Sequence, residues 1–185
     1  MQRFEFRLSG MGGQGLVLAG IIMAEAAIAQ GYNVVQTASY GPESRGGASR
    51  SEVIVSEFDI DYPAVINADY LLAMTQEAAE RFAGEIKPGG IALYDTTWVK
   101  TPPRPDGVRL LGYQLTEAAI ERYQKAIFAN IIGLGIICAS ADVIDAKNML
   151  GALLARVPKR HKEANEQAFG YGMELFRTGK LKVSA

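Results

Sequence analysis

A glycine-rich segment near the N-terminus constrains the fold more than any other feature of this chain. Residues 10–15 read Gly-Met-Gly-Gly-Gln-Gly, which matches the Gly-x-Gly-x-x-Gly pattern and adds a fourth glycine. Apolar and charged residues alternate over residues 4–8, which predicts a strand, and the Ala- and Ile-rich residues 16–30 predict a buried helix. Residues 33–37 predict a second short strand. This order predicts a β-α-β unit with the glycines at its first turn.

The glycine loop favours a ligand that carries phosphate. Glycine tolerates positive φ and lets the backbone approach a ligand closely. The N-terminus of the following helix offers unpaired amides and a partial positive charge to a diphosphate. Gly10, Gly12, Gly13 and Gly15 are therefore candidate binding residues, and Gln14 adds a side-chain donor. The alternative is a tight turn that only lets the helix pack on the strand.

The second predicted strand argues against a nicotinamide site. Such a site carries an acidic residue at the end of that strand, about 20 residues after the loop, for the ribose hydroxyls. Residues 34–37 read Val-Val-Gln-Thr, with neither that acid nor an arginine for a 2′-phosphate. A self-sufficient nucleotide-dependent dehydrogenase is therefore kept only as an alternative function, and micromolar binding of NADH would revive it.

The rest of the chain repeats strands and helices. Strands are predicted at residues 50–56, 68–74, 91–95 and 108–113, and helices at residues 76–82, 116–123, 130–139, 142–154 and 159–176. Thr75 is a candidate helix cap, and the Lys-Pro-Gly-Gly segment within residues 86–90 predicts a turn. With 185 residues, these elements predict one α/β domain over residues 1–185, a Rossmann-like three-layer sandwich with a mostly parallel sheet.

Composition narrows the classes of function. A net charge of −1 argues against nonspecific binding of nucleic acid, and the longest apolar run, residues 131–141, is too short to cross a bilayer. A single cysteine, Cys138, permits no disulfide framework, which fits a reducing cytoplasm, and excludes an iron–sulfur cluster held by several cysteines of this chain. We therefore expect a cytoplasmic protein with no metal site, no nucleic-acid partner and no membrane partner.

Two single residues outside the glycine loop, His161 and Trp98, carry side chains that can act in a functional site. His161, the only histidine, lies in a basic Lys-Arg-His-Lys run and is expected to be a surface residue rather than a general base. Trp98 is either a contact for a partner or cofactor, or part of the core.

A second loop, residues 39–49, has a composition suited to ligand contact. It reads Ser-Tyr-Gly-Pro-Glu-Ser-Arg-Gly-Gly-Ala-Ser, in which Pro and Gly fix the turn. Arg45 is suited to a phosphate or carboxylate. Because the loop follows the second strand, we expect it beside the glycine loop at the carboxyl edge of the sheet. The alternative is a structural turn with Arg45 solvated or paired to Glu43.

Taken together, the two loops resemble those of the gamma subunit of 2-oxoacid:ferredoxin oxidoreductases. Residues 130–137, Asn-Ile-Ile-Gly-Leu-Gly-Ile-Ile, and residues 165–170, Asn-Glu-Gln-Ala-Phe-Gly, are also similar to segments of that family. The resemblance covers nearly the whole chain. The opening Phe-Arg-Leu-Ser-Gly-Met-Gly-Gly-Gln-Gly is most similar to the gamma chain of the 2-oxoglutarate enzymes.

The resemblance implies an activity that this chain cannot perform alone. The complete enzyme would oxidatively decarboxylate 2-oxoglutarate, form succinyl-CoA and pass two electrons to ferredoxin; pyruvate, branched-chain and aryl 2-oxoacids are the alternative substrates. Thiamine diphosphate, Mg and iron–sulfur clusters would lie in alpha and beta subunits, with a ferredoxin-like delta subunit as a further candidate. No catalytic residue is expected in this chain alone, and an assembly subunit that binds nothing is the remaining alternative.

The role implied for the gamma chain is a contribution to coenzyme A binding. By resemblance, the residues that meet its phosphates are Gly12, Gly13, Gln14 and Gly15. Those that line the path of its thiol arm are Ser39, Tyr40, Gly41, Arg45 and Gly46. Asn130 is expected to reach the nucleotide end.

Overall fold

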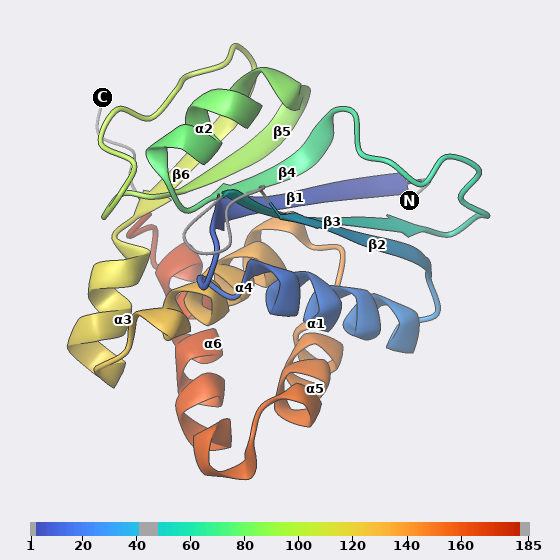
Figure 1. Cartoon of the computed structure of the whole chain (residues 1–185). Helices are drawn as coiled ribbons and strands as arrows, with labels where there is room; N and C mark the ends of the chain where they lie inside the picture. The colour runs from blue at the N-terminus through green and yellow to red at the C-terminus, as the bar shows by residue number, and fades with distance from the viewer. Residues whose placement is uncertain (1–2, 41–47, 182–185) are drawn as a thin grey trace.

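One mixed sheet organises the chain, which a computed structural model describes for residues 3–40 and 48–181. Its six strands lie in the order β2-β3-β1-β4-β5-β6 (Figure 1). The β1–β4, β4–β5 and β5–β6 pairs are parallel, whereas β3 is antiparallel to both of its neighbours. The strands are β1 (Arg3–Met11), β2 (Asn33–Tyr40), β3 (Ala48–Ser56), β4 (Ala68–Ala73), β5 (Ile86–Asp95) and β6 (Arg109–Tyr113).

Helices cover both faces of this sheet unequally, which confirms the predicted α/β sandwich. Figure 1 shows α2 alone on one face and the other α-helices on the opposite face. The helices are α1 (Leu16–Ala29), α2 (Gln76–Phe82), α3 (Leu115–Tyr123), α4 (Ala129–Ala141), α5 (Ala146–Arg156) and α6 (Lys162–Arg177), with short 3-10 turns at Ala83–Glu85, Ala126–Phe128 and Lys159–His161. Within the described ranges, no helix has the length and apolar content needed to cross a membrane.

The predicted β-α-β unit at the N-terminus is wrong in one respect, because β2 does not lie next to β1. β3 turns back after β2 and inserts between the two, with Ser49 of β3 opposite Tyr40 on one side and Gly10 on the other. β1 and β2 still run in the same direction, so their carboxyl ends reach the same edge of the sheet. The expectation that Ser39 and Tyr40 lie near the glycine loop is therefore confirmed.

Two other predicted elements differ from the structure. The turn predicted within residues 86–90 is an irregularity inside β5, whose pairing with β4 shifts register between Ala68 and Tyr70. The helix predicted from residue 142 begins only at Ala146. Asp142 takes a left-handed φ of 54° at the end of α4, and the Asp145 side chain caps α5 by accepting from the Asn148 amide at 2.8 Å.

The main core lies between the sheet and the helices opposite α2. Phe6 and Leu8 of β1 and Val53 and Val55 of β3 face this core, together with nearly the whole of α4. The α4–α6 contact is unusually close, because a Cβ atom at Gly172 would lie 2.1 Å from the carbonyl oxygen of Ile132. This face is therefore a dry packing surface.

Candidate functional site at the carboxyl edge of the sheet

The glycine loop joins β1 to α1, and its shape depends on the glycines. Gly13 and Gly15 adopt φ values of 93° and 75°, which side chains with a Cβ rarely allow. At Gly10, an added Cβ would lie 2.2 Å from the Gln14 side-chain oxygen, which folds back over the end of β1. The sequence pattern thus corresponds to a compact loop that returns on itself.

The Gln14 side chain braces this loop. Its Oε1 accepts from the Met11 amide at 2.7 Å, and its Nε2 donates to the carbonyl of Met74 at 3.2 Å. These bonds tie the loop to the end of β4. A phosphate contact by Gln14 remains a prediction; the second N–H of its Nε2 would be the donor, because the first is used in the bond to Met74.

The first turn of α1 presents backbone donors at the same edge. The Gly15 cap supplies no side-chain hydrogen bond, and the first turn contains no acidic residue. The first intrahelical bond runs from the Ala19 amide to the Gly15 carbonyl at 3.0 Å. The amides before Ala19 therefore lie at the positive end of the helix, where an anion binds favourably.

Asn130 supports the loop from below. Its side chain is 1% exposed, and its Nδ2 donates to the Gly15 carbonyl at 3.0 Å. A Cβ at Gly15 would lie 2.2 Å from that same nitrogen, so the glycine and the asparagine require each other. Asn130 also lines a small cavity of about 160 Å³ with Lys125 and His161. Its predicted contact with a nucleotide remains a prediction, and its observed role is to position the loop.

The end of β2 brings the second predicted group to this edge. Ser39 lies opposite Arg50, which in turn lies opposite Ser9 of β1. Tyr40 is 68% exposed, so its ring is available to a ligand or partner. Gly41, Arg45 and Gly46 lie outside the described residues, and their part in the site stays a prediction from sequence.

Two hollows meet along this edge. The polar cavity, of about 250 Å³, lies between α2 and the ends of the first three strands and is lined by Ser9, Gly10, Ser39, Tyr40, Ser49, Arg50, Thr75, Glu77, Ala78, Arg81 and Phe82. The apolar groove, of about 610 Å³, lies on the other side of the glycine loop and is lined by Met11, Gly12, Gly13, Gln14, Met74, Thr75, Gln76, Glu77, Trp98, Thr116, Ala126 and Ile127. Thr75 and Glu77 belong to both, so one elongated ligand can enter both.

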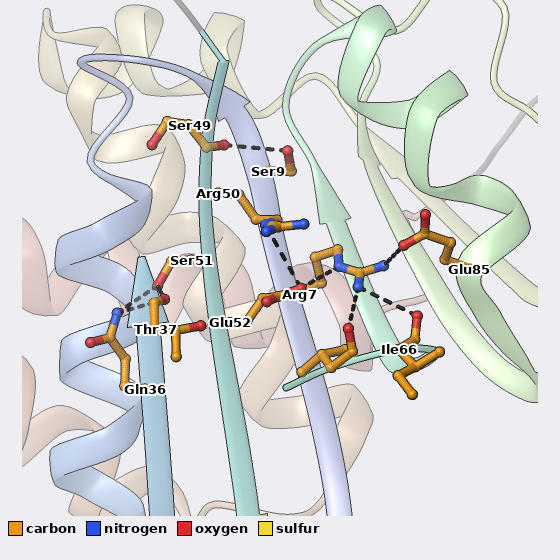
Figure 2. A network of polar contacts seen from close by, with 11 residues as sticks. Arg7, Ser9, Gln36, Thr37, Ser49, Arg50, Ser51, Glu52, Ile66 and Glu85 are labelled. Atoms are coloured by element: carbon orange, nitrogen blue, oxygen red, sulfur yellow. Dashed lines mark hydrogen bonds and ion pairs between the residues drawn. The ribbon is translucent and has the colours of Figure 1, made fainter. Parts of the chain in front are cut away.

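Arg50, which lines the polar cavity, belongs to a buried ionic network (Figure 2). Arg7 is 2% exposed, and its guanidinium reaches Glu52 at 2.7 Å, Glu85 at 2.5 Å and the carbonyl of Val65 at 2.8 Å. Arg50 lies beside it, with a longer contact of 3.9 Å to Glu52. The side of β1 and β3 that faces α2 is therefore charged where the other side is apolar.

Sequence reasoning missed Arg50, Arg81 and Phe82. Arg50 begins a predicted strand and Arg81 ends a short helix, positions that carry no motif. The available signal was the alternation of β3, which places Arg50 and Glu52 on one face and Val53 and Val55 on the other. The face with Arg50 and Glu52 lies against α2 because the chain crosses over from β3 to β4 and then forms α2 on that side of the sheet. The sequence pattern does not specify this crossover.

Three residues outside the motifs can also be placed. Trp98 is 53% exposed and lines the apolar groove, so the core alternative for it is wrong. Cys138 is buried, its Sγ donates to the Ile144 carbonyl at 3.3 Å, and burial raises the pKa of its thiol to about 11. His161 is half-buried in the wall of the small cavity beside Asn130.

Comparison with known proteins agrees with this architecture. The family described as pyruvate ferredoxin/flavodoxin oxidoreductase matches residues 5–175. The 2-oxoglutarate synthase subunit KorC of Methanocaldococcus jannaschii is 42% identical over 175 residues, which cover 94% of each chain. The family match therefore spans both loops, α1 to α5 and most of α6.

Solved structures give the same result. The crystal structure of a keto/oxoacid ferredoxin oxidoreductase gamma subunit from Geobacter sulfurreducens is 41% identical, covers 95% of this chain and 99% of its own, and superposes with a TM-score of 0.84. A 2-oxoglutarate:ferredoxin oxidoreductase from Magnetococcus marinus, solved with 2-oxoglutarate, coenzyme A and succinyl-CoA, shares the fold with a TM-score of 0.77 at 23% identity; the match covers 97% of this chain and 31% of that one. This chain belongs to the pyruvate ferredoxin/flavodoxin oxidoreductase family and is a gamma subunit of the 2-oxoacid:ferredoxin type.

Proposed function

We propose that this chain is the gamma subunit of a 2-oxoglutarate:ferredoxin oxidoreductase and that it contributes to the coenzyme A site. The nearly full-length similarity to a 2-oxoglutarate synthase subunit carries the choice of substrate. Pyruvate, branched-chain and aryl 2-oxoacids are the alternatives. The reaction would oxidatively decarboxylate 2-oxoglutarate, form succinyl-CoA and reduce ferredoxin in the cytoplasm, with residues 1–185 acting as one gamma-type domain.

The arrangement of the carboxyl edge supports coenzyme A as the ligand. The uncapped first turn of α1 suits a diphosphate, because backbone amides and the helix dipole both favour an anion there. The apolar groove is lined by Met11, Trp98 and Ile127 among others, which suits a largely uncharged arm. Gly10, Gly12, Gly13, Gln14 and Gly15 would form the wall between phosphate and arm.

The end of β2 completes the proposed site. Ser39 and Tyr40 lie at the same edge as the glycine loop and would contact the ligand there. Gly41, Arg45 and Gly46 would follow them along the ligand, with Arg45 as a phosphate partner. Asn130 would act through its bond to the Gly15 carbonyl.

The redox chemistry is assigned to partner subunits. Thiamine diphosphate with Mg would supply the carbanion chemistry and iron–sulfur clusters the electron path when bound in alpha, beta or delta chains. The one cysteine of this chain is buried and hydrogen-bonded, so it cannot hold a cluster that needs several thiolates. This chain would bind and orient coenzyme A toward those partners.

Purification of the complex from its source, followed by an assay with matched 2-oxoacids, tests the proposal. We expect a thiamine-binding chain and an iron–sulfur chain to copurify with this one. In the presence of coenzyme A and ferredoxin, kcat/KM for 2-oxoglutarate should exceed that for pyruvate, 2-oxoisovalerate and indolepyruvate by at least about tenfold. An equal or higher value for any of these would contradict the substrate assignment.

A further inference from the structure

Three arginines surround one aromatic ring beside the glycine loop. The guanidinium carbons of Arg7, Arg50 and Arg81 lie 4.8, 5.7 and 5.2 Å from the centre of the Phe82 ring. Phe82 is itself 4% exposed, so the ring is a fixed platform rather than a mobile surface group. Cation–π contacts of this kind restrict where each guanidinium can point.

The three arginines differ in how their charge is balanced. Arg7 is fully engaged by Glu52 and Glu85 at 2.7 and 2.5 Å. Arg50 has only a longer contact, 3.9 Å, to the same Glu52 Oε1 that Arg7 contacts at 2.7 Å, and its side chain is 35% exposed. Among residues 3–40 and 48–181, no carboxylate forms an ion pair with Arg81. Both arginines line the polar cavity, where Glu77 is the one described carboxylate and is exposed to solvent.

Hydroxyl groups add neutral donors to this cavity. Thr75 accepts a hydrogen bond from the Ala78 amide at 3.2 Å, which leaves its own hydroxyl proton free to donate. The exposed Ser39 and Tyr40 carry two further hydroxyls on the opposite wall. The cavity therefore combines two cations with several neutral donors, the composition that binds an oxyanion.

We propose that the polar cavity is a phosphate-binding pocket in which Arg50 and Arg81 contact the phosphate and Phe82 positions both guanidiniums. A phosphate monoester carries a charge of about −1.5 to −2 at neutral pH. This charge balances two guanidiniums better than the single negative charge of a ligand carboxylate would. The inference rests on the proposed coenzyme A site. Coenzyme A has both a phosphate-bearing end for this pocket and an uncharged arm for the adjoining apolar groove, whereas a 2-oxoacid is too small to enter both.

Equilibrium binding to the assembled complex tests the pocket without relying on turnover. Arg50→Gln and Arg81→Gln should each weaken coenzyme A binding by about five- to tenfold, because each removes one partly exposed charge-assisted contact. Arg81→Lys should restore part of the affinity, and Glu77→Gln should strengthen binding because it removes the opposing charge. Thermal unfolding of each variant would verify that the fold is intact.

Arg122→Gln is the matched control. Arg122 also lies in the last turn of a helix, α3, with its guanidinium over an aromatic ring, 3.8 Å from the centre of Tyr171, but it lines neither the polar cavity nor the apolar groove. Its loss should leave the affinity for coenzyme A unchanged. An equal loss in Arg122→Gln and Arg81→Gln would show a general charge effect and overturn the assignment.

Dephospho-coenzyme A identifies which phosphate is bound. If the pocket takes the 3′-phosphate, the arginine variants lose affinity for coenzyme A but not for the dephospho form. If it takes the diphosphate, they lose the same factor for both; either result supports a phosphate pocket. Unchanged coenzyme A binding in both arginine variants, or weakened binding of 2-oxoglutarate instead, would overturn it.

Inorganic pyrophosphate separates this inference from the proposed function. A wild-type complex that does not bind coenzyme A would contradict the proposed function alone. In that case, pyrophosphate binding to the full chain would still be expected, weakened by Arg81→Gln and unaffected by Arg122→Gln. Failure of pyrophosphate to distinguish these two variants would then overturn the pocket.

Discussion

The two faces of strands β1 and β3 are built from alternate residues of the same segments, yet they have opposite physical characters. Phe6, Leu8, Val53 and Val55 point into a dry core under α1 and α4, whereas Arg7 and its ion partners point toward α2. The apolar face gains stability by removing surface from water. The polar face contributes less net stability, since burying charges has a desolvation cost, but it places guanidiniums next to the candidate site. This contrast predicts that mutations on the polar face will act through unpaired charges, whereas mutations on the apolar face will act through packing.

The largest effect is expected from breaking the ionic network at Arg7. Arg7→Met should lower the free energy of unfolding by about 3–5 kcal/mol, because Glu52 would remain buried with only its 3.9 Å contact to Arg50. Changing Glu52 to leucine in the same chain should recover much of that loss. Urea unfolding of both variants measures this, and a single-variant loss below about 1 kcal/mol would show that the network is effectively solvated.

A smaller loss is expected at the helix contact on the apolar face. Gly172→Ala should cost about 2–3 kcal/mol, because the new methyl group would meet the carbonyl of Ile132 and push α4 and α6 apart. Gly170→Ala is the control in the same helix, since nothing lies within 4 Å of its added Cβ, and it should stabilise the protein by up to about 1 kcal/mol. Equal effects in the two variants would contradict close packing between α4 and α6.

The proposed ligand contact of Arg45 predicts a functional change without a large stability change. Arg45→Ala in the assembled complex should raise KM for coenzyme A by about tenfold, near 1.4 kcal/mol, and leave KM for 2-oxoglutarate unchanged. Steady-state kinetics with each substrate varied in turn measure this. An unchanged KM for coenzyme A would remove Arg45 from the site.

The smallest effect is expected from the exposed ion pair between Glu25 of α1 and Arg156 of α5. The hydrogen bond from Arg156 and its charge hold the pKa of Glu25 below its ordinary value of 4.5. A lowered folded-state pKa stabilises the protein above the unfolded pKa, and the contribution disappears as the pH falls through the folded value. The stability difference between wild type and Glu25→Gln should therefore be slight at neutral pH, shrink further with salt, and vanish in acid. A difference that grows on acidification would contradict this sign.

Local sequence patterns predicted most of the fold. The helix that follows the glycine loop, the Thr75 cap and the buried strand before that cap are all in place, because capping, glycine geometry and hydrophobic periodicity act over a few residues. The insertion of β3 between β1 and β2 was not predicted, since strand order depends on which edges pair and not on local periodicity. The later start of α5 follows from Asp145, whose side chain caps the helix by accepting from the Asn148 amide.

The candidate site was predicted less completely. Motifs located the glycine loop and the end of β2, but Gln14 and Asn130 bond to the loop itself, which residue type alone does not reveal. Arg50 and Arg81 are 31 positions apart in the chain and meet only through Phe82. Such convergence depends on the packing of α2 against the sheet, which local sequence patterns do not specify.

Hydrogen–deuterium exchange of the assembled complex, with and without saturating coenzyme A, tests the central claim most directly. If coenzyme A binds at the carboxyl edge, backbone amides over residues 11–18 and at the end of β2 should gain protection, and those of α4 and α6 should not. No added protection at the glycine loop while coenzyme A is bound, or protection confined to the helices of the apolar face, would contradict the account.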